Sequence, residues 1–210
     1  MYRINILWGN KMSIIDKLKS LRHKALVKIY SALPLKRNKI ILWSDSFKSY
    51  GCNPKYITEY ILENYPNKFD IVWVISKLVN IPESIPQNVR VVRYFSKEYL
   101  YELHTAGFVI CNARTLDSYL WTKRKGQVYI QTWHSSLRLK SIEKDAEKTL
   151  PESYIQAAKG DSKKIDYIIS GCTLSSRIFK NSFWYDGKIL ECGTPRIDYL
   201  LKEAHNHYLF

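Results

Sequence analysis

The sequence predicts an α/β fold in which a mainly parallel sheet is covered by helices on both faces. Short apolar runs such as Asp70–Ile75 (DIVWVI) and residues 108–111 are typical of strands that are buried on both sides. Segments with apolar residues at helical spacing separate these runs, so strand and helix alternate from Lys39 onward. With 210 residues, 46% of them hydrophobic, the chain can form one packed domain and a short appendage.

Local patterns predict the individual elements. Asn53-Pro54 is typical of a helix start, with asparagine as the N-cap and proline in the first turn, and this helix is expected to end near Asn64. Ser96 is expected to cap a helix that ends near Ala106. Further strands are predicted at residues 40–43, 89–94, 128–132, 166–170 and 188–191, and further helices before residue 166, at 175–183 and from 195 onward.

A basic amphipathic helix is predicted before the first strand. Residues 1–39 contain ten Lys or Arg and one acid, so +9 of the net charge of +14 lies in this segment. Between residues 13 and 33, apolar residues recur at helical spacing, and the helix is expected to end before Pro34. The apolar positions are Ile14, Ile15, Leu18, Leu21, Ala25, Ile29, Ala32 and Leu33. The basic positions are Lys17, Lys19, Arg22, Lys24 and Lys28.

Two interpretations of this helix remain open from the sequence. It either packs on the domain as an ordinary helix or lies on an anionic membrane surface, with the five basic residues as the membrane-binding set. We therefore divide the chain into a membrane-associating segment, residues 1–38, and one α/β domain, residues 39–210.

Composition and motifs exclude several other classes. The pI of about 9.5 favours polyanionic partners. The sequence contains no dinucleotide-binding or P-loop motif, and no pattern of a known RNA- or DNA-binding module, so a nucleic-acid partner is not expected. It also has no apolar run of the ~20 residues that a spanning helix needs. The four cysteines are not spaced as metal ligands, and we expect buried free thiols of a reduced, cytoplasmic protein.

The segment VYIQTWHSSLRLK, residues 128–140, carries the candidate chemistry. A strand ends near Thr132, and His134 follows at its carboxyl end, where α/β sheets bind their ligands. Histidine transfers protons near neutral pH. Two hydroxyl side chains, Ser135 and Ser136, follow it, and two cations, Arg138 and Lys140, can neutralise a phosphate. On this evidence alone, the sequence favours a purely structural imidazole that orders the loop, and a catalytic His134 is the alternative.

Three segments in order resemble the CDP-glycerol glycerophosphotransferase family of teichoic acid polymerases and primases. The first is SDSFKSYGCNPKYITEYILENYPNKFDIVWV, near the start of the domain. The second is QTWHSSLRLKSIEKD, which is similar to the QTWHGTPLKK-type segment of that family. The third is DYIISGCTLSSRIFKNSFWYDGKILECGTPRIDYLL, which ends in the family's G-x-P-R-x-D pattern and includes Arg196. Together they cover most of residues 40–201.

This resemblance implies a Rossmann-like fold that forms one half of a two-domain GT-B enzyme. The amino-terminal half would supply the acceptor contacts and the histidine of the W-H motif, and the carboxyl-terminal half would hold CDP-glycerol. The acceptor would be a lipid-linked saccharide or a growing poly(glycerol phosphate) chain, and CMP would leave. His134 would be the general base, with Ser135, Ser136, Arg138, Lys140 and Arg196 contacting acceptor or phosphate. No cofactor is evident, a metal requirement stays open, and the expected location is peripheral, on the cytoplasmic face of the cell membrane.

Two departures from the family pattern qualify these expectations. Ser135-Ser136 stands where many members have Gly-Thr. The sequence also stops at Phe210, whereas a complete enzyme of two such domains needs roughly 350 residues. We therefore expect a fragment that is inactive alone, with a possible separate carboxyl-terminal half. The alternatives are half of another GT-B transferase that moves a sugar or ribitol phosphate, or a non-catalytic basic module that binds membrane or nucleic acid.

Overall fold

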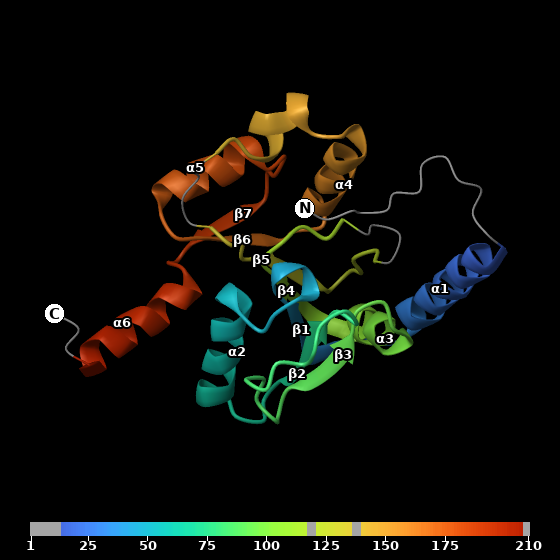
Figure 1. Ribbon diagram of the computed structural model, residues 1–210, viewed down its shortest axis with the longest axis horizontal. Helices are drawn as coiled ribbons and strands as arrows, with labels where there is room; N and C mark the ends of the chain where they lie inside the picture. The colour runs from blue at the N-terminus through green and yellow to red at the C-terminus, as the bar shows by residue number, and fades with distance from the viewer. Residues whose placement is uncertain (1–13, 117–120, 136–139, 208–210) are drawn as a thin grey trace.

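The protein contains one seven-stranded sheet in the order β3-β2-β1-β4-β5-β6-β7, and every pair of neighbours is parallel (Figure 1). The computed structural model describes residues 14–116, 121–135 and 140–207, and the side chains of 21–116, 121–135 and 140–202. The strands are β1 (Lys36–Trp43), β2 (Asp70–Ile75), β3 (Arg90–Arg93), β4 (Ala106–Cys111), β5 (Val128–Gln131), β6 (Tyr167–Ser170) and β7 (Lys188–Glu191). The predicted mainly parallel α/β fold is confirmed.

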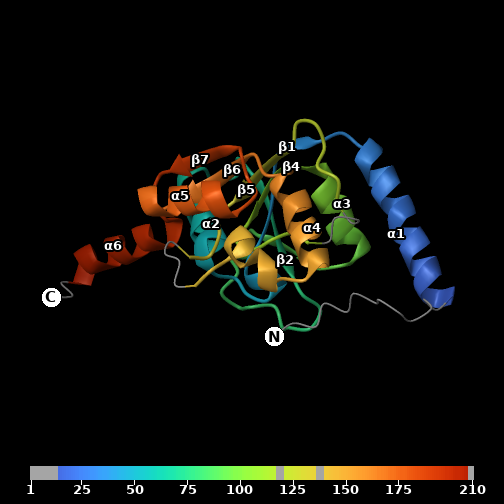
Figure 2. The ribbon, with the colours of Figure 1, turned by 90° about the horizontal axis from the view of Figure 1, so that it is seen from above.

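Helices cover both faces of this sheet. The α-helices are α1 (Ile14–Ala32), α2 (Cys52–Asn64), α3 (Lys97–Thr105), α4 (Glu152–Ser162), α5 (Thr173–Ser182) and α6 (Pro195–His207), and the short 3-10 helices are η1 (Asp45–Phe47) and η2 (Glu143–Thr149). Leucines of α3 and Phe179 of α5 belong to the apolar core on one face, whereas isoleucines of α2 pack on the core of the other face. Helices α1 and α6 extend at opposite ends of the molecule (Figure 2).

Side-chain alternation along each strand divides the apolar residues between the two faces. In β1, Ile41 and Trp43 point to the α3 face, and Ile40 and Leu42 point to the α2 face. The same alternation holds in β2. Because both faces are covered, consecutive residues of a strand are all buried, which explains why the sequence shows continuous apolar runs.

The sheet order creates a topological switch point between β1 and β4. The chain adds β2 and β3 on one side of β1 and then crosses to add β4 on the other side. Connections that leave neighbouring strands in opposite directions open a crevice outside their carboxyl ends, where α/β proteins bind ligands. The loops after β1, β4 and β5 meet at this edge, which is where His134 lies.

Helix α1 packs on the domain by one side and leaves another side open. Leu26, Val27 and Tyr30 contact the core, with the Tyr30 ring 5.5 Å from the ring of Tyr101 in α3. Leu21 and Ile29 are 63% and 57% exposed. The expected apolar stripe is therefore not the side that packs on the domain. In the parts of the chain that the structure describes, no helix is long and apolar enough to span a membrane.

Local predictions differ from the structure in two instructive places. Gly51, and not Asn53, is the N-cap of α2, because the Asn53 side chain reaches across to the loop after β5 instead. All four cysteines are free, as expected, but only Cys111 is buried, and Cys192 is exposed. The prediction of buried thiols was wrong because Cys172 and Cys192 follow strands and Cys52 begins α2, all at the carboxyl edge of the sheet. The boundary drawn at residue 38 falls inside β1.

Candidate active site

The loop after β5 presents the His134 ring to solvent at the carboxyl edge of the sheet. Trp133 adopts a left-handed backbone conformation with φ of 50°, and its N–H donates to Oε1 of Gln131 at 3.0 Å. This turn buries the Trp133 ring and leaves His134 exposed, with the two ring centroids 4.2 Å apart. A left-handed non-glycine residue is costly, and such residues concentrate at functional sites.

One hydrogen bond determines the tautomer of the His134 ring. Nδ1 lies 3.0 Å from the backbone oxygen of Asn112, which follows β4. A carbonyl oxygen can only accept, so Nδ1 of the neutral ring carries the proton and Nε2 carries a lone pair. The ring is thus oriented and chemically prepared to accept a proton at Nε2, as a general base must be.

The Asn112 side chain joins the ends of β1 and β4 beneath this ring. Its Oδ1 accepts from the N–H of Asp45 at 2.9 Å, and its Nδ2 donates to Oδ1 of Asp45 at 3.0 Å. The Asp45 carboxylate also accepts from the Ser49 hydroxyl at 2.5 Å. Three consecutive residues of η1, beginning at Asp45, have positive φ. These two hydrogen bonds fix the position of Asn112. The backbone oxygen of Asn112 then fixes the orientation of the His134 ring.

Helix α2 supplies the second support for the loop. The buried Asn53 amide donates to the backbone oxygens of Thr132 and Trp133, both at 3.1 Å. Its own oxygen accepts from the N–H of Arg196 in α6 at 3.4 Å. The Arg196 guanidinium in turn donates to the His134 backbone oxygen at 3.1 Å. Residues from α2, β5 and α6 therefore hold one short loop from three directions.

The structure brings together some of the predicted site residues. His134, Ser135 and Arg196 lie at the carboxyl edge, and Lys140 is exposed on the segment that follows. Arg196 was predicted to contact acceptor or phosphate, and here part of its guanidinium holds the His134 backbone. Ser136 and Arg138 lie outside the described residues, as do the side chains of Lys17 and Lys19. Beside the loop there is a cavity of only about 10 Å³, which has room for about one water molecule.

His104 provides a structural comparison for His134. Its ring is fully buried in α3, with Nδ1 2.8 Å from the backbone oxygen of Leu100. Burial lowers the pKa of His104, so this ring stays neutral in the core. Both histidines make the same kind of hydrogen bond, but only His134 is open to a substrate.

Sequence reasoning missed Asn112 and Asp45 as parts of the site. Asn112 directly follows β4 and Asp45 is the second residue after β1, and polar residues just after a buried strand are a recognisable signal. Among the residues described here, no group of three or more His, Cys, Asp or Glu side chains could hold a metal ion.

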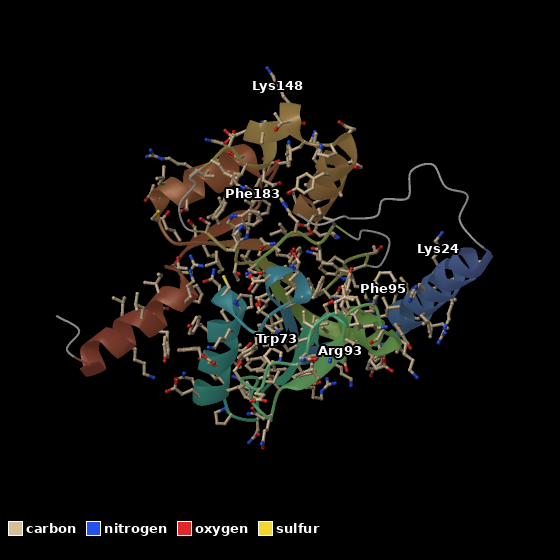
Figure 3. The ribbon with its side chains drawn as sticks, in the orientation of Figure 1. Lys24, Trp73, Arg93, Phe95, Lys148 and Phe183 are labelled. Atoms are coloured by element: carbon tan, nitrogen blue, oxygen red, sulfur yellow. The ribbon has the colours of Figure 1, made fainter. Side chains whose placement is uncertain are left out.

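A buried ionic cluster lies behind the loop. The Arg114 guanidinium donates to Glu143 at 3.0 Å, to Asp161 at 3.4 Å and to the Ser162 hydroxyl at 2.7 Å. It also lies 4.8 Å from the ring centre of Phe183, which is inside the molecule between α4 and α5 (Figure 3). The Phe183 ring packs edge-on against Trp133, with centroids 4.7 Å apart. The cluster therefore packs behind Phe183, and Phe183 in turn packs against the Trp133 ring.

The fold and the site define a Rossmann-like α/β domain of the kind that forms half of a GT-B transferase. The chain belongs to the family described as CDP-Glycerol:Poly(glycerophosphate) glycerophosphotransferase, whose model matches residues 25–208. The family expected from the three sequence segments is confirmed.

Known relatives agree with this assignment. The chain is 34% identical to the teichoic acid poly(glycerol phosphate) polymerase of Bacillus spizizenii, over 93% of this chain and 51% of that protein. It is also 34% identical to the teichoic acid glycerol-phosphate transferase of Staphylococcus aureus, over 82% of this chain and 44% of that protein. A solved structure of the wall teichoic acid polymerase TagF superposes with a TM-score of 0.75, at 30% identity, over 94% of this chain and 52% of that one. The chain thus spans between 24% and 51% of the length of the curated relatives it matches.

Proposed function

We propose that this chain is the acceptor-side half of a CDP-glycerol glycerophosphotransferase of teichoic acid biosynthesis. The observation that carries the proposal is the His134 ring at the switch point. Its Nδ1 is bonded to the Asn112 oxygen, and its Nε2 has no hydrogen-bond partner among the residues that the structure describes. Family membership and the names of the relatives support the substrate class. The acceptor is a lipid-linked saccharide or poly(glycerol phosphate) chain, and the donor is CDP-glycerol held by the second half.

The reaction follows from these roles. The terminal hydroxyl of the acceptor attacks the β-phosphorus of CDP-glycerol, and Nε2 of His134 takes the hydroxyl proton. A new P–O bond forms to the acceptor, the P–O bond to CMP breaks, and CMP leaves with the electron pair. Lys140 and Arg138 neutralise the acceptor phosphate. Cations next to this phosphate lower its repulsion from the donor phosphates.

The chain alone should not release CMP from CDP-glycerol. Phosphoryl transfer depends on positioning both reactants and stabilising charge, and the nucleotide contacts are assigned to the second half. Calorimetry with CDP-glycerol should detect no specific binding to the purified chain. The same chain joined to the remaining length of the Bacillus spizizenii relative should release CMP when acceptor is added. Rapid CMP release by the unjoined chain would disprove the half-enzyme proposal.

We further infer that α1 binds an anionic membrane surface and makes the protein peripheral. Leu21 and Ile29 are exposed on the side of α1 that does not pack on α3, and Arg22, Lys24 and Lys28 are exposed around them (Figure 3 labels Lys24). An apolar stripe flanked by cations is the pattern of an interfacial helix. Each basic residue near such a surface contributes at most ~1 kcal/mol.

Charge reversal on α1 tests this inference without uncovering the core. Deleting residues 1–38 would expose the apolar surface that Leu26 and Tyr30 cover, so point changes are cleaner. Lys24→Glu with Lys28→Glu should move the protein from the pellet to the supernatant when it is sedimented with anionic vesicles. The matched control is Lys148→Glu with Lys180→Glu, two exposed positions on η2 and α5. Equal loss of sedimentation in both double variants would mean that α1 is only a structural helix.

A further inference from the structure

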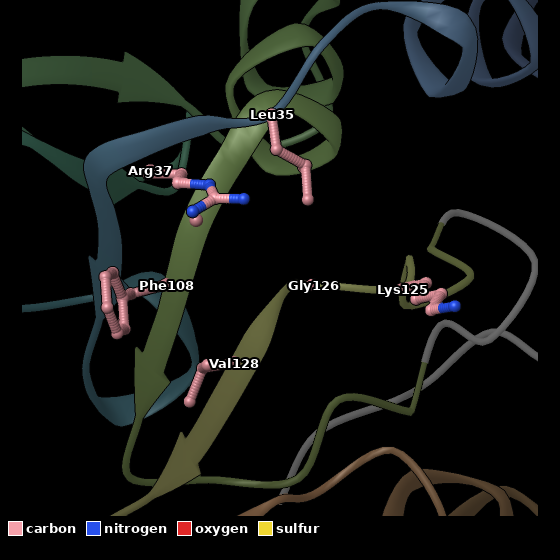
Figure 4. Close-up of a pocket in the computed structure, with 7 residues that line it drawn as sticks. Leu35, Arg37, Phe108, Lys125, Gly126 and Val128 are labelled. Carbon is pink, nitrogen blue, oxygen red and sulfur yellow. The ribbon is translucent and has the colours of Figure 1, made fainter.

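A second pocket lies at the opposite edge of the sheet from His134, at the amino ends of β1, β4 and β5. Its volume is about 460 Å³, and it is lined by Leu35, Arg37, Gly107, Phe108, Lys125, Gly126 and Val128. Figure 4 shows the Leu35 and Arg37 side chains directed toward the space in front of Gly126 and Val128. Leu35 follows the last residue of α1 by three positions, so the pocket directly adjoins the helix that we assign to the membrane.

An irregularity in β1 creates this pocket. The pairing of β1 with β4 shifts between Lys36 and Ile40, so that Arg37 lies on a bulged segment outside the regular ladder. This segment crosses close to Gly107, where an added Cβ would lie only 2.8 Å from the Arg37 backbone oxygen. Bulges commonly redirect a side chain at the edge of a sheet. Here the bulge turns Arg37 out over the glycine.

A tight turn before β5 forms the other wall. The Gln127 N–H donates to the Arg124 oxygen at 3.0 Å, and Gly126 between them has a φ of 90°, a conformation that side chains rarely adopt. The absence of a side chain at Gly126 keeps the space next to Leu35 open, since an added Cβ would lie 3.5 Å from Cδ1 of Leu35. Two glycine positions therefore maintain the pocket.

The chemistry of the lining suits an anion that carries an apolar part. The Arg37 and Lys125 side chains make no hydrogen bond or ion pair with any residue that the structure describes. None of the lining residues is acidic, while Leu35, Phe108 and Val128 provide apolar contact. An unpaired guanidinium beside apolar walls is suited to a phosphate on an apolar stem, because arginine binds phosphate through two parallel donors.

We propose that this pocket binds the phosphate headgroup of an anionic membrane lipid, with Arg37 as the main contact. This inference rests on the membrane part of the proposed function and is independent of the catalytic part. A headgroup seated here would fix the orientation of the domain on the bilayer, which an amphipathic helix alone leaves free to roll. The amino edge of the sheet would face the lipid, and the His134 edge would face away from it.

Binding to phosphatidylcholine vesicles with and without phosphatidylglycerol tests the proposal, with two variants that act differently. Arg37→Gln removes the main cation, and Leu35→Trp fills the pocket without changing the charge. Neutralising any one cation near an anionic surface lowers binding by at most about fivefold, which corresponds to ~1 kcal/mol. Both variants should lower the affinity for phosphatidylglycerol vesicles by about tenfold or more, and neither should change binding to phosphatidylcholine alone.

Two controls match these variants. Lys36→Gln removes a neighbouring exposed cation that does not line the pocket, and should stay within the fivefold limit. Leu78→Trp adds an indole on an exposed loop, where Leu78 is 94% exposed, and should not weaken binding. A thermal melt shows whether Leu35→Trp is folded. If this variant is not folded, Arg37→Gln and the competition experiment decide the result.

Competition with soluble anions distinguishes the source of the phosphate. Inorganic phosphate and glycerol phosphate should displace the wild-type protein from phosphatidylglycerol vesicles only at concentrations that displace the Lys36→Gln control equally. At such concentrations the anions act by screening charge. If either anion binds the lipid-free protein tightly through Arg37, the pocket is a site for a free phosphate and the lipid assignment is wrong. If Arg37→Gln behaves like Lys36→Gln while the α1 variants lose binding, the helix binds membrane and the pocket does not.

Discussion

Replacing His134 by alanine should lower glycerol phosphate transfer by about 10²–10⁴-fold in a protein that carries both halves, because loss of a general base typically costs this much. The thermal midpoint should stay nearly constant, since the ring is exposed and gives up one hydrogen bond to the Asn112 oxygen. The rate of CMP release and a thermal melt of the same preparation together measure both effects.

The His134→Gln and His104→Ala variants show whether the lower rate of His134→Ala comes from lost proton transfer. A glutamine amide can donate to the Asn112 oxygen but cannot accept a proton near neutral pH, so His134→Gln should remain nearly as slow as His134→Ala. His104 makes a similar bond inside the core, so His104→Ala should lower stability while each folded molecule keeps its activity. If His134→Ala instead melted early and kept its activity per folded molecule, the ring would be structural.

Replacing Arg114 by methionine should cost about 3–5 kcal/mol of stability, the usual loss when one partner of a buried ion pair is removed. The side chains of Arg114, Glu143 and Asp161 are each at most 3% exposed. Without Arg114, the buried Glu143 and Asp161 carboxylates would both lose the guanidinium that pairs with them. Arg177→Met, at an exposed position on α5, is the matched control and should change stability by less than about 0.5 kcal/mol.

The loss in Arg114→Met should grow as the pH rises. Burial raises the pKa of Asp161, and Arg114 opposes that shift, so removing Arg114 raises the pKa of this carboxyl further. A folded-state pKa above the unfolded value means that the folded protein binds more protons, and stability then falls as pH rises through the folded pKa. Urea unfolding at pH 5 and pH 8 should therefore show the larger deficit at pH 8. Equal deficits at both values would contradict the role given to Arg114.

Local patterns in the sequence predicted most of the secondary structure because the physical causes are local. Asp70–Ile75 and Lys188–Glu191 were predicted with the bounds that the structure has. Ser96 caps α3 as expected, with its hydroxyl accepting from the Tyr99 N–H at 3.1 Å. Apolar runs, helical spacing and capping residues act within a few positions of each other, so neighbouring residues suffice to identify them.

The candidate histidine, His134, was also recognisable from the sequence, but its environment was not. His134 could be placed after a strand and matched to a family motif, whereas the roles of Asn53 and Asn112 could not be deduced. Asn53 looked like a helix cap, the commonest use of asparagine at such a position. In the folded chain its amide instead binds backbone oxygens that are 79 and 80 residues away.

The sequence by itself thus determined the α/β class, the order of the elements, the family and the position of His134. Only the tertiary structure decided which tautomer His134 adopts, which side of α1 is left open, and that Arg37 and Leu35 share a pocket with Gly126. The physical reason is that these features depend on contacts between residues brought together by the strand order β3-β2-β1-β4-β5-β6-β7 and by one bulge in β1. A one-dimensional pattern records the tendency of each segment, while strand order and register determine which distant side chains meet.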